Sequence, residues 1–243
     1  MSHPPSRSPW FLALARRYAR RRLARGLDGL YVAGLDAARA EARRRPIILA
    51  ANHVGWWDSF LVVAVDEALG TEGYALMDAE SIRRLPFFAR LGALPLERGG
   101  HASTRAGLTL AAEKVDRPGR ALWMFPQGRH RPAHLRPLGF EGGIRLLARR
   151  IPDASIIPTA IQYAWREQPG PAAFVHLGAA LPAAELTTER IESAVEHGLG
   201  EIDAMLAGQR APFPALVRGR TRTPERGVGA RLLGGRTGEA ARA

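Results

Sequence analysis

The chain has no cysteine among its 243 residues. Disulfides, thiolate metal sites and cysteine nucleophiles are therefore excluded, and cysteine usage gives no information on the redox compartment. Long apolar runs are also missing, because no stretch approaches the roughly 20 residues that a membrane-spanning helix needs. The apolar run at residues 10–15 is too short for a signal peptide, and no convincing cleavage site follows it. We therefore expect a protein without a membrane span.

Three common catalytic motifs are absent as well. The sequence has no Gly-x-Ser-x-Gly turn, no Gly-x-x-x-x-Gly-Lys-Ser/Thr loop and no Gly-x-Gly-x-x-Gly turn. Their absence argues against a serine nucleophile, nucleotide hydrolysis and dinucleotide chemistry. His130 and His134 have the spacing of metal ligands, but Pro132 between them prevents the helix which that spacing requires. We expect no metal site.

The formal net charge of +12 is concentrated at the two ends of the chain. Residues 1–25 contain seven arginines and no acidic residue, and residues 216–243 contain seven arginines and two glutamates. Basic ends on a neutral body fit an anionic surface, although an arginine-rich composition can give the same pattern without a partner. No motif interleaves aromatic and basic residues, which argues against a nucleic-acid partner and leaves a phosphate-lipid surface.

Composition divides the chain into three parts. Residues 1–26 are predicted to contain a short basic amphipathic helix, which could cap the body but which we expect to lie in a membrane interface. Residues 27–210 alternate short apolar strands with helices, which predicts one α/β domain with a mixed, largely parallel sheet flanked by helices. Residues 211–243 are basic and glycine-rich, and we expect them to be flexible.

Apolar periodicity and turn residues predict the individual elements. The expected strands cover residues 30–32, 46–50, 73–77, 93–96, 120–125, 155–161 and 173–178, and the expected helices cover residues 9–25, 59–69, 86–92, 102–115, 142–150 and 187–207. In sheets of this kind, ligands bind beyond the carboxyl ends of the strands. Polar stretches follow strands at residues 52–58, 97–100 and 126–131, and we expect the active site there.

The stretch ANHVGWWDSF at residues 51–60 places His53 five positions before Asp58. A histidine can take a proton from a hydroxyl near neutral pH, and a carboxylate at its other ring nitrogen fixes the tautomer. The alternative is structural, with Asp58 as an ordinary helix N-cap and His53 as a hydrogen-bonded histidine at a strand end. Trp56 and Trp57 fit either a lipid-facing slot or a plain core. If His53 is a base and the protein supplies no nucleophile, the hydroxyl belongs to the substrate, which favours direct acyl transfer.

Four short blocks, in order, resemble those of the glycerolipid acyltransferase superfamily, the group that contains the 1-acyl-glycerol-3-phosphate acyltransferases. The resemblance runs from about residue 30 to residue 178, behind a basic N-terminal segment. The blocks are Asn52-His53-x4-Asp58, Gly92-Ala-Leu-Pro-Leu-Glu-Arg98, Phe125-Pro126-Gln127-Gly128-Arg129 and Ile156-Ile157-Pro158-Thr159-Ala160-Ile161. Four blocks are more specific than any one, so the catalytic interpretation of the first block is preferred over the structural one.

The resemblance implies a role for each block. His53 would be the general base, Asp58 would orient it, and Arg98 would contact a phosphate or another anionic group of the acceptor. The loop after the third block's strand would shape the acceptor site or help to hold the thioester. Its candidate substrate-binding residues are Gln127, Gly128, Arg129 and Arg131. No metal or cofactor is implied beyond the co-substrate, acyl-coenzyme A or acyl carrier protein.

The third block departs from the family pattern, which is usually Phe-Pro-Glu-Gly-Thr-Arg. Gln127 replaces the glutamate, and Arg129 and His130 replace the threonine and arginine. Arg131, one place further on, could supply the cation. The serine common in the first block is here Gly55. These changes leave the catalytic pair intact and alter the acceptor side.

The implied function is an O-acyltransferase that moves a fatty acyl group from a thioester to the hydroxyl of a lipid. Lysophosphatidic acid in phospholipid biosynthesis is the favoured acceptor, and a glycosylated lipid or carotenoid glycoside is the alternative, because the amide of Gln127 suits sugar hydroxyls. Thioester hydrolysis is a further possibility within enzymes, and a nucleic-acid-binding protein is the alternative of another class. The expected partners are an anionic membrane surface, the lipid acceptor and the acyl donor, with the protein peripheral on the cytoplasmic face of the membrane.

Overall fold

The computed structural model describes residues 8–97, 99–166 and 168–220. Its strands are β1 (Gly29–Ala33), β2 (Ile47–Ala51), β3 (Glu72–Asp78), β4 (Ala93–Leu96), β5 (Arg120–Met124), β6 (Ser155–Ala164), β7 (Ala172–Leu177), β8 (Leu181–Pro182) and β9 (Ala215–Arg218). Its α-helices are α1 (Pro9–Gly26), α2 (Leu35–Arg44), α3 (Asp58–Leu69), α4 (Ala79–Arg84), α5 (Phe87–Leu91), α6 (His101–Lys114), α7 (Gly143–Ala148) and α8 (Thr188–Leu206). A short 3-10 helix, Ala183–Glu185, precedes α8.

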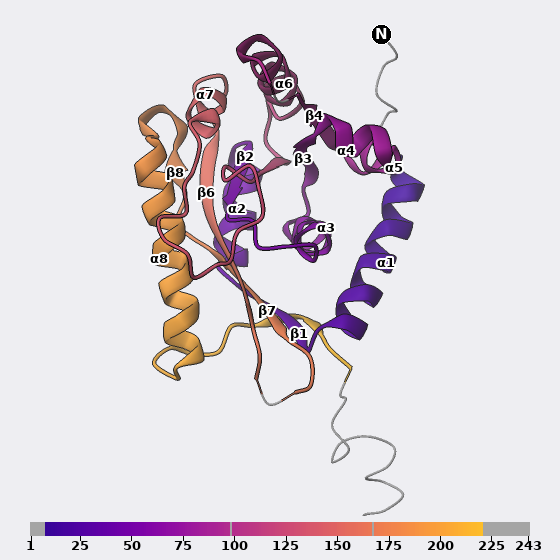
Figure 1. The fold of residues 1–243 in the computed structure, drawn as a ribbon, viewed down its shortest axis with the longest axis vertical. Helices are drawn as coiled ribbons and strands as arrows, with labels where there is room; N and C mark the ends of the chain where they lie inside the picture. Colours follow the sequence, from indigo (N-terminus) through magenta and orange to yellow (C-terminus); the bar gives the residue numbers. More distant parts are fainter. Residues whose placement is uncertain (1–7, 98, 167, 221–243) are drawn as a thin grey trace, which may run out of the picture.

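Within these ranges the strands form one nine-stranded sheet in the order β4-β3-β5-β2-β6-β7-β1-β9, with β8 paired to β6 beside this path. The pairs from β4 to β6 are parallel, as is β1 with β7. The β6–β7, β6–β8 and β1–β9 pairs are antiparallel. Helices cover both faces of the sheet (Figure 1). The prediction of a single α/β domain with a mixed, largely parallel sheet is confirmed.

Two apolar cores lie on the two faces of the sheet. Side chains of α6, α7 and α8 form one core, and side chains of α1, α2 and α3 form the other. Strand β2 supplies both, because Ile48 and Ala50 belong to the first core and Ile47 and Leu49 to the second. Burial on both faces explains why this strand is an unbroken apolar run, as is usual for parallel sheets. Since β2 is fixed from both sides, the loop at its carboxyl end starts from a rigid point.

Helix α1 packs against α3, so this helix caps the body. Leu23 is completely buried in the α1–α3 core. Arg20 Nε lies 2.7 Å from a carboxylate oxygen of Glu67 on α3. The inner face of this helix therefore caps the body, which was the alternative prediction for residues 9–25. Among the described helices, none combines the length and the apolar character that crossing a membrane requires.

The prediction that the domain ends at residue 210 is wrong, because the segment that follows contributes a strand to the sheet. Strand β9 pairs antiparallel with β1, with Val217 opposite Leu30, and Val217 is buried. The four-residue strand adds an edge to the sheet, so the domain extends at least to Arg218. Basic and glycine-rich composition around it concealed the strand. The remainder of the predicted flexible tail, residues 221–243, lies outside the described residues, as do residues 1–7.

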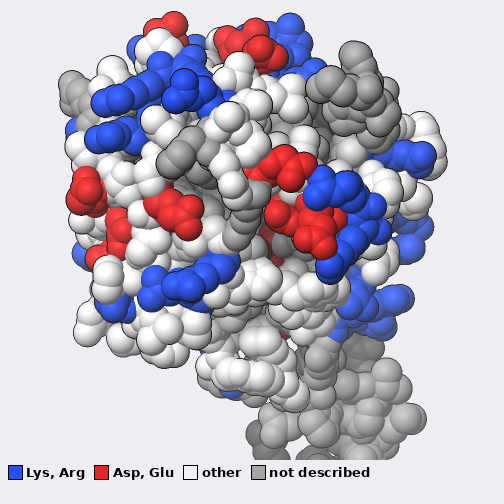
Figure 2. Space-filling model, turned by 45° about the horizontal axis from the view of Figure 1, so that its top comes forward, with Lys and Arg blue, Asp and Glu red and all other residues white. Residues whose placement is uncertain are grey.

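Charged side chains are mixed on the surface. On the face drawn in Figure 2, basic and acidic side chains lie in separate small groups instead of one continuous basic field. A nucleic-acid-binding face carries a clustered basic patch or stripe. This face therefore gives no support to the nucleic-acid alternative.

Candidate active site

The three polar stretches that follow β2, β4 and β5 meet at one edge of the sheet. The residues after these strands line a single cavity of about 950 Å³. From these stretches, the lining residues are His53, Gly55, Trp56, Glu97, Gly99, Pro126, Gly128, Arg129 and His130. The three strands are parallel, which brings their carboxyl ends to the same edge.

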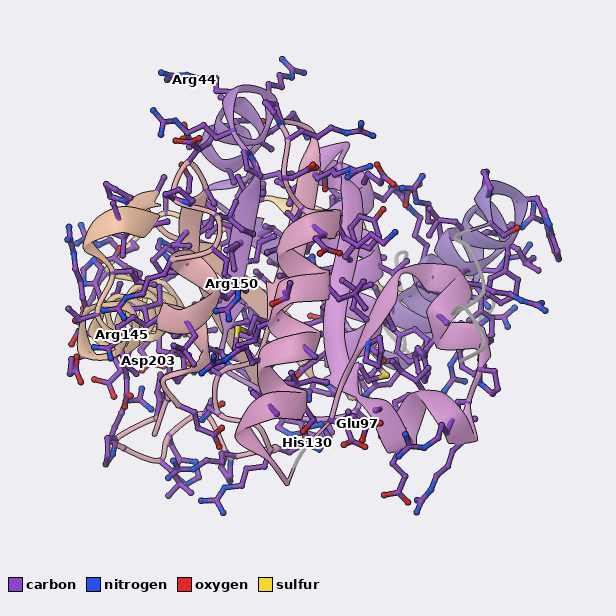
Figure 3. All side chains as sticks on the ribbon, turned by 90° about the horizontal axis from the view of Figure 1, so that it is seen from above. Arg44, Glu97, His130, Arg145, Arg150 and Asp203 are labelled. Carbon is purple, nitrogen blue, oxygen red and sulfur yellow. The ribbon has the colours of Figure 1, made fainter. Side chains whose placement is uncertain are left out.

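Figure 3 shows the molecule from above, with this edge at the bottom of the picture. Glu97, after β4, and His130, after β5, lie at the same side of the molecule, whereas Arg44, at the end of α2, lies at the opposite side. Both Glu97 and His130 line the cavity. The site is therefore built at the carboxyl edge that the sequence indicated.

His53 and Asp58 are in direct contact. His53 Nδ1 lies 2.6 Å from Asp58 Oδ2. The side chain of Asp58 is fully buried, whereas that of His53 is 25% exposed. An ionised carboxylate can only accept a hydrogen bond, so Nδ1 carries the proton and Nε2 is left as the proton acceptor. The ring thus lines the cavity with Nε2 unprotonated, an arrangement that suits a base.

The loop between β2 and α3 turns Asp58 back toward His53. The backbone N–H groups of Val54 and Gly55 donate to Asp58 Oδ2 at 2.8 and 3.0 Å. Asp58 is the first residue of α3, and Trp57 at the N-cap position makes no side-chain cap. Asp58 is therefore not an ordinary helix N-cap, and its carboxylate at the helix N-terminus is favoured by the helix dipole.

The start of the same loop is tied to β6 through Asn52. Its side-chain amide donates to the carbonyl oxygen of Ile161 at 2.9 Å and accepts from the N–H of Ile161 at 2.7 Å. Asn52 is 1% exposed. Beyond the end of β2, these two bonds continue the β2–β6 hydrogen-bond ladder, with the side chain of Asn52 in place of backbone groups. They fix the position from which the loop carries His53.

Two rings pack against the imidazole of His53. Phe125 stacks on it with ring centroids 4.2 Å apart, and His130 meets it edge-on at 4.0 Å. The pKa of His130 is lowered, first by burial and second by repulsion from His53, although Asp58 acts in the opposite direction. His130 is therefore uncharged at neutral pH. His130 therefore places no positive charge beside the ring of His53.

Gln127 lies behind His53. Its Oε1 accepts from the backbone N–H of His53 at 2.6 Å, and its Nε2 donates to the carbonyl oxygen of Leu138 at 2.8 Å. The residue is 4% exposed. Both ends of the amide are thus engaged within the protein. The geometry gives Gln127 a positioning role, linking His53 to the loop between β5 and α7.

Replacing Gln127 with leucine should lower the melting temperature. The change leaves the N–H of His53 without its acceptor, whereas the carbonyl of Leu138 keeps its bond from Arg131. An unsatisfied buried polar group costs about 1–3 kcal/mol. For a chain of this size, each kcal/mol corresponds to a decrease of roughly 2–4 °C in Tm. Thermal unfolding followed by circular dichroism measures the change, with Gln209→Leu, at an exposed position, as the control. Equal melting temperatures for the two variants would contradict the role given to Gln127.

The other predicted substrate-binding residues differ in placement. Gly128 and Arg129 line the cavity. Arg131 instead supports the loop, because its Nη1 donates to the carbonyl of Leu138 at 2.6 Å and its backbone N–H donates to the carbonyl of His53 at 2.8 Å. Arg98 lies outside the described residues. In the part of the chain that the structure describes, no group of three or more His, Cys, Asp or Glu side chains is placed to hold a metal ion.

Tyr163 is a site residue that the sequence did not indicate. Its hydroxyl donates to Asp58 Oδ1 at 2.6 Å, across 105 positions of sequence. Burial is the main cause that raises the pKa of Tyr163 above its ordinary value, and the charge of Asp58 and the hydrogen bond add to it. The phenol therefore keeps its proton and acts as a donor. Within an apolar strand, a single tyrosine has no spacing signal that could have revealed this contact.

The wall of the cavity has two characters. The part supplied by α1, α3, β3 and α5 is mostly apolar, with Leu12, Val62, Val63, Ala75, Met77 and Phe88 among its residues. The part supplied by the segments after β4 and β5 is polar, with Glu97, Arg129, His130 and Glu141. His53 also lines this space. The arrangement suits one apolar and one polar reactant that meet at a base.

Comparisons with known proteins agree with this chemistry. The fold is similar to the crystal structure of PlsC, the 1-acyl-sn-glycerophosphate (LPA) acyltransferase of Thermotoga maritima, with a TM-score of 0.58 and 18% identity over 79% of this chain and 80% of that one. At this identity the likeness concerns the fold. A comparison with curated protein sequences gave no match. The sequence matches the family model described as Acyltransferase over residues 30–162, which is more than half of the chain. By this match the chain belongs to the acyltransferase family and is an acyltransferase.

Proposed function

We propose that this acyltransferase moves a fatty acyl group from acyl-coenzyme A or acyl carrier protein to the hydroxyl of lysophosphatidic acid. The observation that carries the proposal is the His53–Asp58 pair beside a cavity with one apolar and one polar wall. The apolar wall suits a fatty chain, because each buried methylene contributes about 0.8 kcal/mol. A base with an open Nε2 suits activation of a substrate hydroxyl.

The reaction needs one proton acceptor and no protein nucleophile. His53 Nε2 takes the proton of the acceptor hydroxyl as its oxygen attacks the thioester carbonyl carbon. The new C–O bond forms, the C–S bond breaks, and the imidazolium returns its proton to the departing thiolate sulfur. Asp58, 2.6 Å from Nδ1, stabilises the positive charge on the ring during this exchange. The products are an ester and a free thiol.

A phosphorylated acceptor is favoured by the polar wall. Arg129 is exposed and lines the cavity, and a guanidinium can hold a phosphate through two hydrogen bonds. Glu97 and Glu141 also belong to this wall, but Glu97 is paired with Arg83 at 2.7 Å. The sugar-lipid alternative rested on the neutral amide of Gln127. Both ends of that amide are hydrogen-bonded to backbone groups of the protein. The acceptor activity named for PlsC is consistent with this choice.

The test is an assay of acceptors with one labelled acyl thioester. Lysophosphatidic acid, a glycosylated lipid and buffer alone are offered separately, and the products are identified by mass spectrometry. We expect labelled phosphatidic acid to form in the presence of lysophosphatidic acid, and no product with His53→Ala. Acylation of the sugar lipid alone would replace the proposed acceptor, and release of free fatty acid alone would make the protein a thioesterase.

We further propose that the enzyme is peripheral on the cytoplasmic face of a membrane, whose surface carries anionic lipids. On α1, Trp10, Leu14 and Tyr18 follow one another at helical spacing, and each is more than half exposed. Exposed Trp56 and Leu85 line the cavity itself. An apolar and aromatic surface with arginines around it is typical of helices that lie in a membrane interface. Lipid substrates could then enter the cavity from the bilayer.

Replacing Arg17, Arg21 and Arg25 with glutamine should weaken binding to anionic vesicles. All three are exposed on α1. Each basic residue near such a surface is worth about 1 kcal/mol, and the difference should diminish as salt is added. Sedimentation with vesicles that contain phosphatidylserine measures the bound fraction.

The matched control changes Arg43, Arg44 and Arg45 to glutamine. These arginines are also exposed, and Arg44 lies at the edge opposite to the cavity (Figure 3). We expect this variant to bind vesicles nearly as well as the unmodified protein. Equal losses in both variants would mean that binding follows net charge, and the α1 surface would lose its proposed role.

A further inference from the structure

The two carboxylate oxygens of Asp58 have different surroundings. Oδ2 accepts from three donors, the ring of His53 and the backbone N–H groups of Val54 and Gly55. Oδ1 accepts from the hydroxyl of Tyr163, the one donor to it among the described residues. The three bonds on Oδ2 come from the loop that carries Asp58. The bond on Oδ1 comes from β6 and is independent of that loop.

We propose that Tyr163 is a positioning residue for acyl transfer, which acts through Asp58 to set the orientation and the proton affinity of His53. Bonds to one oxygen alone let the rest of the carboxylate swing about that held oxygen through coupled changes of the side-chain torsions, whereas a donor on the second oxygen fixes its plane. The hydrogen bond also draws negative charge away from the side of the carboxylate that faces His53. This inference rests on the proposed function, since it assigns a task within that reaction.

The strand that carries Tyr163 is suited to this task. Strand β6 pairs with β2 on one side and β7 on the other, and Tyr163 is opposite Ala173. Two residues earlier, Ile161 holds the side chain of Asn52 at the start of the catalytic loop. One rigid strand therefore supports both ends of the segment from Asn52 to Asp58. A phenylalanine would fill the same space. The hydroxyl of Tyr163 therefore contributes the hydrogen bond to Asp58 and not packing.

Several charged and titratable groups surround the pair of His53 and Asp58. On the cavity side these are His130, whose ring meets that of His53, and Arg129 and Glu141 in the polar wall. From α1, the guanidinium of Arg22 lies over the rings of Trp56 and Trp57, at 5.5 and 5.8 Å. Arg131 bonds the backbone of His53 and the carbonyl of Leu138. Tyr163 alone among these groups bonds the carboxylate of Asp58 in the described structure.

The first experiment is the pH dependence of kcat/KM for Tyr163→Phe. We expect kcat to fall roughly 10–100-fold, the effect of losing a hydrogen bond to a charged group, with KM little changed. Without the phenol, more negative charge faces His53, which then binds a proton more readily. The acid limb of the profile should therefore move to higher pH. Tyr31→Phe, in the same sheet and outside the cavity, is the matched control and should do neither.

A double-mutant cycle with Asp58→Asn tests whether Tyr163 acts through Asp58. We expect Tyr163→Phe to cost much less activity in that background, because the negative charge whose distribution the phenol sets is gone. Additive losses, or an acid limb that stays in place, would overturn the proposal and leave Tyr163 a packing residue.

Incorporation of 3-fluorotyrosine provides a second measurement if Tyr163→Phe fails to fold. The fluorinated phenol keeps its shape and is a stronger donor, so the acid limb should move to lower pH, and an unchanged limb would count against the proposal. These outcomes differ from a failure of the proposed function. If purified His53→Ala still transferred acyl groups, the reaction assigned to the pair would be wrong whatever Tyr163 does.

Discussion

Replacing His53 with alanine should lower kcat for acyl transfer by about 10²–10⁴-fold. The change removes the group that takes the proton of the acceptor hydroxyl. The neighbouring His130 should not substitute for it, because the backbone N–H groups of Val54 and Gly55 still hold the carboxylate of Asp58 at the place of the lost ring. A histidine without that partner lacks the fixed tautomer and the stabilised imidazolium.

The variant is expected to fold, because the side chain of His53 is partly exposed and does not belong to either core. Release of thiol from an acyl thioester, in the presence of acceptor, measures kcat, and circular dichroism checks the fold. His134→Ala, an exposed histidine on the same loop as His130, is the matched control and should retain activity. Near-normal turnover of a folded His53→Ala protein would end the mechanism proposed here.

Replacing Asp58 with asparagine should lower kcat by about 10²–10³-fold, through loss of charge. Three donors converge on Oδ2, so the amide oxygen is expected to occupy that place and keep Nδ1 of His53 protonated. The amide nitrogen would then face Tyr163, whose hydroxyl can rotate to accept. The tautomer survives, but the imidazolium that forms in the reaction loses its counter-charge.

The pH profile separates this loss from a loss of geometry. Without a negative charge at Asp58, His53 binds a proton less readily, so the acid limb of kcat/KM should move to lower pH. That direction is opposite to the one expected for Tyr163→Phe. Asp116→Asn, at an exposed position, is the control for the substitution itself. An Asp58→Asn enzyme with the limb unmoved would show that the charge is not what Asp58 supplies.

The sequence predicted most of the sheet, since buried parallel strands leave continuous apolar runs such as that of β2. Helix α2 was not predicted, because its buried residues, Ala38 and Ala42, are small and the rest of the helix is rich in arginine. Helix α4 has six residues and one buried side chain, and β9 has four residues among charged neighbours. In each case tertiary contacts, and not the local pattern, decide the structure.

The contact between His53 and Asp58 was predictable for a different reason. His53 and Asp58 lie in one loop, so their chemistry and spacing are both visible in the sequence. Tyr163 reaches the same carboxylate from a distant strand, and only the β2–β6 pairing brings it there. The role of Gln127 also needed coordinates, because an irregular loop has no period from which the inward and outward sides can be assigned.

The packing of α1 on α3 has a thermodynamic consequence for the cavity. Leu12 of α1 belongs to the cavity wall, while Leu23, three turns further along the helix, is anchored in the core. A single helix thus contributes to the wall, to the cap of the body and to the exposed aromatic face. If a process that holds this helix more firmly raises the affinity for whatever fills the cavity, occupation of the cavity favours that process by the same coupling free energy.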